Sequence, residues 1–285
     1  MKVAIITDTT SDLTIQECER RNVTLIPLKI CFGQESFTDQ YEIGPEEFYD
    51  KMLASEALPT TSQPSPGDFV ELYNRLKEEG YEGAVSMHIA APLSGTVQAA
   101  QIAADMVEFP VKVLDSHGAT TSLSLLVDAA CALREEGCSL DEMFQRLCAY
   151  RDTLGTVLAP ETLENFVKGG RLPEEMAQQS SMLNIRLLFT FNEEGGVAPL
   201  DKVKGSKGIV SRCISFAQEY VEANGPAYIH MTHVRNQKAV DAVCDGIRDL
   251  GLECEVTSVE RCGATIATHL GIGALVMSVG PQQIA

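Results

Sequence analysis

Hydroxyl groups that could donate hydrogen bonds to an anion gather in two short segments of the chain. Thr61 and Ser62 belong to a run of three hydroxyl residues just before two prolines, which predicts a stiff loop with free donors. Ser94, Gly95 and Thr96 open a helical pattern in which Ser94 is a natural N-cap and glycine lets a ligand approach the backbone. The free N–H groups and the dipole of a helix N-terminus favour an anion. An ordinary turn and simple helix capping are the alternatives.

An arginine and a histidine beside glycines are the other candidates for binding. Arg171 ends a Lys-Gly-Gly-Arg segment at a predicted helix end, where Gly170 permits a left-handed C-cap. His269 lies in a Thr-His-Leu-Gly-Ile-Gly segment whose G-x-G lacks the strand-then-helix setting of a dinucleotide fingerprint. A plain helix stop with solvated cations and a histidine satisfied within the core are the alternatives.

The signatures of several enzyme and metal sites are absent from the sequence. It contains no P-loop, no G-x-S-x-G elbow, no C-x-x-C pair and no His–Glu spacing typical of a metal site. We therefore expect no cofactor, no metal and no catalytic residue. Most of the nine cysteines read as buried, reduced thiols. The N-terminal apolar run is shorter than the roughly 7–15 residues of a secretory signal, and no run approaches the roughly 18 of a membrane span. We therefore expect a cytoplasmic protein without stable membrane insertion.

The charge of the chain argues against one class of partner. Lys and Arg number 22 and Asp and Glu 40, which gives a formal charge of −18. Residues 1–152 carry 11 basic and 25 acidic groups, hence −14, and residues 153–285 carry 11 and 15, hence −4. A protein that binds a phosphate backbone needs a basic face, so we expect no nucleic-acid partner.

The elements that must position these residues follow from the hydrophobic pattern. In the first half, short apolar runs alternate with helical patterns, which is typical of an α/β domain with a parallel sheet. Strands are expected at 3–7, 23–30, 84–89 and 111–114, and helices at 14–21, 46–55, 67–79, 94–107, 121–135 and 140–154.

The second half of the chain predicts a mixed sheet. Residues 185–191 and 197–204 read as an antiparallel hairpin, and 227–233 and 253–259 as strands around a helix at 237–250. A short strand at 156–158, helices at 161–168, 173–181 and 206–223, and a glycine-punctuated apolar end at 263–279 complete the pattern. With no flexible linker between the halves, we expect two closely packed α/β domains, residues 1–153 and 154–285.

The candidate segments, taken together and in order, resemble the DegV family. The resembling segments span nearly the whole chain: residues 7–13, 61–65, 93–96, 115–116, 168–171 and 268–274. The resemblance implies a two-domain α/β protein that binds one long-chain fatty acid between its domains. It also implies a partner, the separate catalytic subunit of a bacterial fatty acid kinase, which supplies the ATP chemistry and phosphorylates the bound carboxylate.

The resemblance and the donor chemistry together define an expected carboxylate site. The expected carboxylate-binding residues are Thr61, Ser62, Ser94, Gly95, Thr96 and His269, and the expected supporting residues are Gly170, Arg171 and Ser116. A buried carboxylate requires hydrogen bonds and an offset of its charge. Burial of a 16-carbon tail at ~0.8 kcal/mol per CH₂ supplies about 12 kcal/mol before association costs. We therefore expect the tail to dominate affinity and the head-group donors to decide orientation.

Two other classes of function remain open from the sequence. A stand-alone enzyme could use His269 and Arg171 on a small carbonyl or phosphorylated substrate, since an anion-ready helix lies in the parallel-sheet half. A regulatory protein could bind another protein through its acidic first half, although such charge is commonly only solvating. The expected function is a non-catalytic subunit that holds a fatty acid for a kinase.

Overall fold

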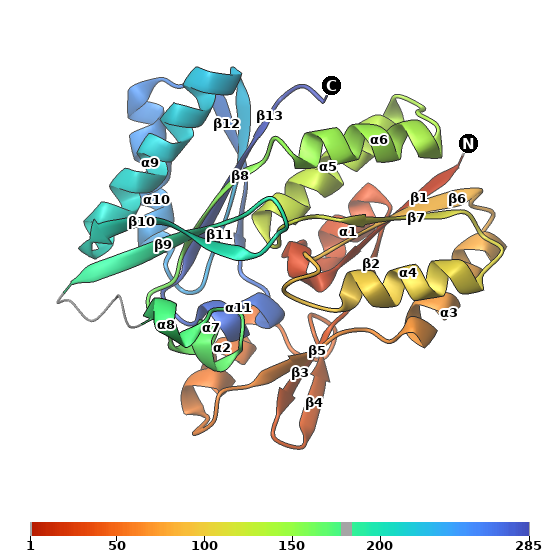
Figure 1. Ribbon diagram of the computed structural model, residues 1–285, viewed down its shortest axis with the longest axis horizontal. Helices are drawn as coiled ribbons and strands as arrows, with labels where there is room; N and C mark the ends of the chain where they lie inside the picture. Colours follow the sequence, from red (N-terminus) through yellow and green to blue (C-terminus); the bar gives the residue numbers. More distant parts are fainter. Residues whose placement is uncertain (1, 178–183, 285) are drawn as a thin grey trace.

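The structure is a computed structural model that describes residues 2–177 and 184–284, and it contains two α/β domains (Figure 1). The N-terminal domain is built on a parallel sheet whose strands lie in the order β2 (Val23–Ile26), β1 (Val3–Asp8), β6 (Gly83–His88) and β7 (Val111–Asp115). The helices of this half are α1 (Ile15–Arg21), α2 (Pro45–Ala54), α3 (Pro66–Glu78), α4 (Thr96–Met106), α5 (Thr121–Glu135) and α6 (Leu140–Arg151).

Both faces of the parallel sheet are covered by helices, which is why its strands read as continuous apolar runs. Successive side chains of a strand point to opposite faces. Val3 and Ile5 of β1 pack in one core with α1, α5 and α6, whereas Ala4 and Ile6 pack in a second core with α3 and α4. The predicted parallel-sheet α/β domain is therefore confirmed.

A small antiparallel sheet that the hydrophobic pattern did not predict lies beside this domain. The expected strand at 23–30 is two strands, β2 and β3 (Lys29–Phe32), because Pro27 lacks the N–H that would continue the ladder. β3 pairs with β4 (Glu35–Thr38) across a turn in which Gly33 has φ +60°. It also pairs with β5 (Thr60–Ser62), so the start of the expected loop at 60–66 is a strand.

The C-terminal domain is built on a mixed six-stranded sheet, as expected. Its strands lie in the order β10 (Val197–Lys204), β9 (Ile185–Phe191), β8 (Gly155–Ala159), β13 (Leu275–Pro281), β11 (Ala227–His233) and β12 (Cys254–Arg261). Its helices are α7 (Glu164–Lys168), α8 (Glu174–Ala177), α9 (Gly205–Asn224), α10 (Gln237–Leu250) and α11 (Ala264–Leu270). The predicted β9–β10 hairpin is confirmed, and among the described strands of this sheet only β11 and β12 pair in parallel.

Several predicted boundaries are wrong. The helix expected at 161–168 starts only at Glu164, and the one expected at 140–154 ends at Arg151. The expected helix 173–181 is described as far as Ala177, and its remainder lies outside the described residues. The apolar end at 263–279 divides into α11 and the central strand β13 because Gly271, at φ +76°, stops the helix.

Helix α5 joins the two domains, because it packs against both main sheets (Figure 1). The Thr121 hydroxyl lies 2.7 Å from that of Ser278 in β13, and the Ser124 hydroxyl lies 2.7 Å from His230 Nδ1 in β11. The hairpin turn of β9–β10 reaches back to the N-terminal domain, where Gly195 packs closely against residues 90 and 117. The halves thus pack without an intervening linker.

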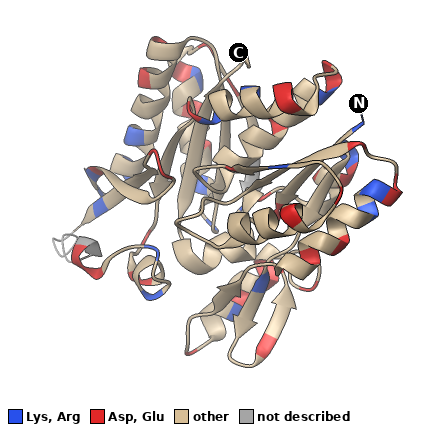
Figure 2. Cartoon of the chain, turned by 45° about the vertical axis from the view of Figure 1, so that its right-hand side comes forward, with Lys and Arg blue, Asp and Glu red and all other residues tan. Residues whose placement is uncertain are grey.

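Charge and cysteine placement complete the fold. Asp and Glu residues are spread over the outer helices and loops of both domains (Figure 2). All nine cysteines are free thiols, but only four of them are buried, so the expectation that most are buried is wrong. Among the described residues, no helix is long and apolar enough to cross a membrane.

Candidate functional site

An apolar cavity of about 120 Å³ lies between the two domains. It adjoins the carboxyl ends of β2 and β6, where open α/β sheets usually bind ligands. The other walls come from β8, the β9–β10 hairpin, α7 and α11. The apolar lining residues are Leu28, Ile89, Leu93, Ala119, Leu158, Phe166, Phe191, Val197, Ile266 and Leu270.

Three polar side chains from distant parts of the chain meet at one end of this cavity. Thr61 of β5 lies 3.1 Å from Nε2 of His269 in the last turn of α11, and Arg171 follows α7. Burial, with a smaller contribution from the Arg171 charge, lowers the pKa of His269 to about 4, so the ring is neutral near pH 7.

The hydrogen bonding of His269 favours one tautomer. Its Nδ1 is buried and has no partner. With the proton on Nε2, the unpartnered Nδ1 carries only a lone pair and no N–H is left buried without an acceptor. The Nε2–H then donates to the Thr61 hydroxyl. The Thr61 hydroxyl then keeps its own proton for a further acceptor.

Arg171 is the cation of the site. Its Nε donates to the Leu93 carbonyl at 3.2 Å and its Nη1 to the Gly169 carbonyl at 2.5 Å, which ties the loop before α4 to the end of α7. Partial burial lowers the pKa of Arg171. No carboxylate of the described residues forms an ion pair with it. The guanidinium therefore offers remaining donors and an unmatched charge to the cavity.

The serine segment before α4 contributes differently from the expectation. The helix begins at Thr96 with Gly95 as its N-cap, and Ser94 does not cap it. The Ser94 hydroxyl instead lies 2.8 Å from the buried hydroxyl of Thr96. Ser94 and Gly95 line the cavity, and Thr96 supports Ser94 from behind.

Besides Thr96, three more of the expected residues do not line this cavity. Ser62 neighbours Thr61 on β5, so its side chain points to the opposite face and is exposed. Ser116 lines a separate polar cavity, and its hydroxyl donates to the Gly118 carbonyl at 2.9 Å. Gly170 is exposed with φ +72° and shapes the chain after α7, as its glycine identity predicts.

A second, outer groove lies on the other side of the polar end. It shares Thr61, Arg171 and His269 with the cavity and adds Lys168 and neighbouring residues. Gly169 belongs to this wall, and a Cβ there would lie 2.4 Å from His269 Nδ1. The glycine therefore lets the chain pass directly over the imidazole ring.

Three polar residues that line the cavity were not among the expected site residues. Gln63 lines the cavity, and a Cβ on Gly95 would lie 2.5 Å from its Oε1. Thr120 and Thr265 also line it. Gln63 follows the hydroxyl run at 60–62, so the sequence pointed to its neighbourhood. Thr265 is distant in sequence and comes next to the cavity only when the chain folds.

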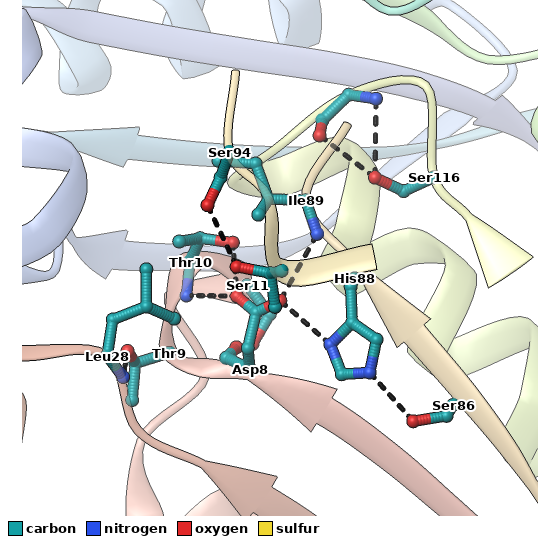
Figure 3. A network of polar contacts seen from close by, with 12 residues as sticks. Asp8, Thr9, Thr10, Ser11, Leu28, Ser86, His88, Ile89, Ser94 and Ser116 are labelled. Carbon is teal, nitrogen blue, oxygen red and sulfur yellow. Dashed lines mark hydrogen bonds and ion pairs between the residues drawn. The ribbon is translucent and has the colours of Figure 1, made fainter. Parts of the chain in front are cut away.

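A buried polar network fixes the walls of the cavity from behind (Figure 3). The Asp8 carboxylate accepts from the backbone N–H of Ile89 at 3.2 Å, and the Thr9 hydroxyl accepts from that of Leu28 at 3.1 Å. His88 lies between Asp8 and Ser86, at 3.0 and 2.7 Å. This Ser–His–Asp order resembles a catalytic triad, but all three side chains are fully buried, so the network is structural.

The described residues contain no group of three or more His, Cys, Asp or Glu side chains that could hold a metal ion. The hydroxyl, imidazole and guanidinium groups at the polar end suit a carboxylate or another small anion. The walls suit an apolar chain.

The comparisons agree with this geometry. A sequence model of the DegV family of uncharacterised proteins matches residues 2–282. A DegV domain-containing protein of Halalkalibacterium halodurans is 31% identical, with 97% of this chain and 98% of that protein covered. A fatty-acid-binding DegV family protein from Thermus thermophilus is 31% identical with a TM-score of 0.91, over 99% of this chain and 100% of that one. DegV of Bacillus subtilis, a fatty acid binding protein, is 26% identical with a TM-score of 0.89, over 99% and 100%. With a family match over nearly its whole length, this chain belongs to the DegV family.

Proposed function

We propose that this protein binds one long-chain fatty acid between its two domains, residues 1–153 and 154–285, with the carboxylate at Thr61, Ser94 and Arg171. The observation that carries the proposal is the Arg171 guanidinium, which has no carboxylate partner among the described residues and stands at the end of an apolar cavity. A half-buried cation without a counter-charge is costly, and a ligand carboxylate would offset that cost. The solved Thermus and Bacillus relatives are fatty-acid-binding proteins.

The hydrogen-bond directions at the polar end fit a carboxylate. His269 donates from Nε2 to Thr61, so the Thr61 proton is free to point at a ligand oxygen. In the same way, Thr96 can donate to Ser94, which leaves the Ser94 proton for the ligand. A carboxylate accepts all of these donors and offers none of its own.

The tail supplies most of the affinity. Burial of a 16-carbon chain contributes about 12 kcal/mol before association costs, at ~0.8 kcal/mol per CH₂. The polar end adds less, but it decides which end of the ligand lies beside His269. The polar end therefore selects ligands with a carboxylate, and the apolar walls accept a hydrocarbon chain.

We further propose that the carboxylate is presented to a separate, ATP-dependent fatty acid kinase. The outer groove shares Thr61, Arg171 and His269 with the cavity, so a kinase that docks at this groove would meet the head-group residues. A carboxylate oxygen attacks the γ-phosphorus of ATP, the bond to the β-phosphate oxygen breaks, and acyl phosphate and ADP form. This chain has no P-loop, so the kinase supplies the nucleotide site. This chain is the non-catalytic subunit, and nine free thiols support a cytoplasmic location.

Two measurements test the proposal. Native mass spectrometry of the purified protein, followed by extraction, should reveal one long-chain fatty acid per chain; a delipidated protein that takes up no fatty acid contradicts fatty-acid binding. Hydroxylamine trapping should detect acyl phosphate only when fatty acid, ATP, this protein and a fatty acid kinase catalytic subunit are combined. Turnover of a small carbonyl or phosphorylated substrate by this protein alone would instead support a stand-alone enzyme.

A further inference from the structure

Two buried carboxyl groups converge on the start of α11 without lining the cavity. Asp12 Oδ1 accepts from the Gly263 N–H at 2.8 Å, and Asp39 Oδ2 accepts from the N–H and hydroxyl of Thr265 at 3.2 and 2.5 Å. A Cβ on Gly263 would lie 3.0 Å from Asp12 Oδ1 and 4.0 Å from Asp39 Oδ2. The N-cap glycine thus makes room for the Asp12 carboxyl group, while the Asp39 distance is an ordinary contact.

These carboxyl groups replace the cap that α11 lacks. The helix has seven residues and no side-chain cap of its own, and a helix this short is not stable in isolation. Ser or Asn would satisfy the same N–H groups without two buried acids, whose pKa values burial raises. Asp12 and Asp39 each also leave one buried oxygen without a partner. Stability alone does not account for this choice of residues.

The same helix face that Asp39 holds also reaches the head-group site. Thr265 and His269 are four residues apart, so they lie on one face of α11. Asp39 directly follows β4, and Thr61 lies in β5 of the same three-stranded sheet. The sheet therefore contacts this face at both ends, through Asp39 on Thr265 and Thr61 on His269.

We propose that Asp12 and Asp39 are positioning residues that fix α11 from the N-terminal domain and thereby set His269 against Thr61. That this placement of His269 matters for ligand binding rests on the proposed function. The position of His269 beside Thr61 can itself be measured in the protein without ligand. It makes the head-group site depend on contact between the domains, because the carboxyl groups and the helix come from different ones.

The titration of His269, followed by NMR in the delipidated protein, tests this inference. The chain has five histidines, and His269→Gln identifies the resonance. In Asp39→Leu, which removes both acceptor oxygens, the pKa of His269 should rise from about 4 toward its ordinary 6.5 as α11 shifts and the ring gains water. Asp39→Asn keeps a carbonyl acceptor for Thr265 and should retain the wild-type titration. An unchanged titration in folded Asp39→Leu overturns the inference.

Two further variants keep the test decisive. If Asp39→Leu does not fold, Thr265→Val removes the hydroxyl that donates to Asp39 and should shift His269 in the same direction by less; no shift there overturns the inference. Asp8→Asn is the matched control, because Asp8 is equally buried but bonds His88 and Ile89 rather than α11. An equal His269 shift in Asp8→Asn would show general loosening and would also overturn it.

Fatty-acid affinity separates this inference from the proposed function. Asp39→Leu should raise the Kd for a fatty acid roughly tenfold, which is the change expected when one head-group hydrogen bond is lost through the shift of α11. A wild-type protein that binds no fatty acid contradicts the proposed function, and the His269 titration still decides the positioning role.

Discussion

Replacement of Thr61 by valine isolates one head-group donor. Valine has nearly the shape of threonine and suits strand β5, so the change removes only the hydroxyl that lies 3.1 Å from His269 Nε2. A hydrogen bond to a charged group contributes ~1.5–3 kcal/mol, and 1.4 kcal/mol is tenfold in affinity, so Thr61→Val should raise the Kd for a fatty acid roughly 10- to 150-fold. The rise should be near tenfold if, in the variant, the His269 N–H donates to the ligand carboxylate in place of the lost hydroxyl. The tail stays buried, so binding is weakened and not abolished.

Titration of delipidated protein against a fluorescent fatty acid measures this change. Ser62→Ala is the matched control, because Ser62 is the next residue of β5, carries the same group and points away from the cavity. We expect the control to bind as the wild type does and both variants to keep the wild-type melting temperature within a few degrees. A Kd for Thr61→Val within about twofold of the control would refute the assignment of the carboxylate to this end of the cavity.

Three further predictions follow from close contacts and burial. Gly169→Ala places a Cβ 2.4 Å from His269 Nδ1 and should weaken fatty-acid binding. Gly170→Ala, at φ +72° with open space around it, should lower stability but leave the affinity unchanged. Equal affinities of the two variants for a fatty acid in calorimetry would contradict this prediction. Burial raises the pKa of Asp12 from 3.8 to about 8, so the folded protein holds a proton that the unfolded chain releases, and stability should fall as the pH rises from 4 to 8. Urea denaturation across that range should show a smaller fall for Asp12→Asn, and an identical slope would argue against a buried acid. Gly195→Ala, at φ +82° and with 2.6 Å to the nearest atom of the N-terminal domain, should lower the melting temperature measurably, and an unchanged one would mean that the hairpin turn does not pack there.

The elements of the fold were predictable where burial leaves a periodic pattern. The β-branched run at 3–7 and the apolar run at 84–89 are strands β1 and β6, since both faces of a parallel sheet are covered. The three-stranded sheet was not predictable, because β4 and β5 are short, partly exposed and without alternation. Both β4 and β5 pair with β3, and β5 lies about 30 residues after β3 in the chain. Such a distant pairing leaves no pattern in the local sequence.

The candidate site divides in the same way. Residue type and glycine context made Thr61, Ser94, Arg171 and His269 candidates, and the family resemblance assigned them to one head-group site. They line one cavity. Ser62 could not be assigned to the outside without knowing that 60–62 is a strand, in which neighbours point to opposite faces. Ser94 was expected as an N-cap, but the helix starts two residues later, and its hydroxyl is left for the cavity.

The sequence by itself determined the chemistry of this protein: an acidic chain with two α/β halves, hydroxyl and glycine segments suited to an anion, and no nucleotide or metal signature. The tertiary structure alone decided which of these groups meet. Thr61, Arg171 and His269 are separated by about a hundred residues at each step and come together only because α7, α11 and the small sheet pack across the domain interface. Local propensity is encoded in neighbouring residues, whereas the burial that lowers the pKa of His269 and leaves Arg171 facing an apolar cavity arises from contacts between domains.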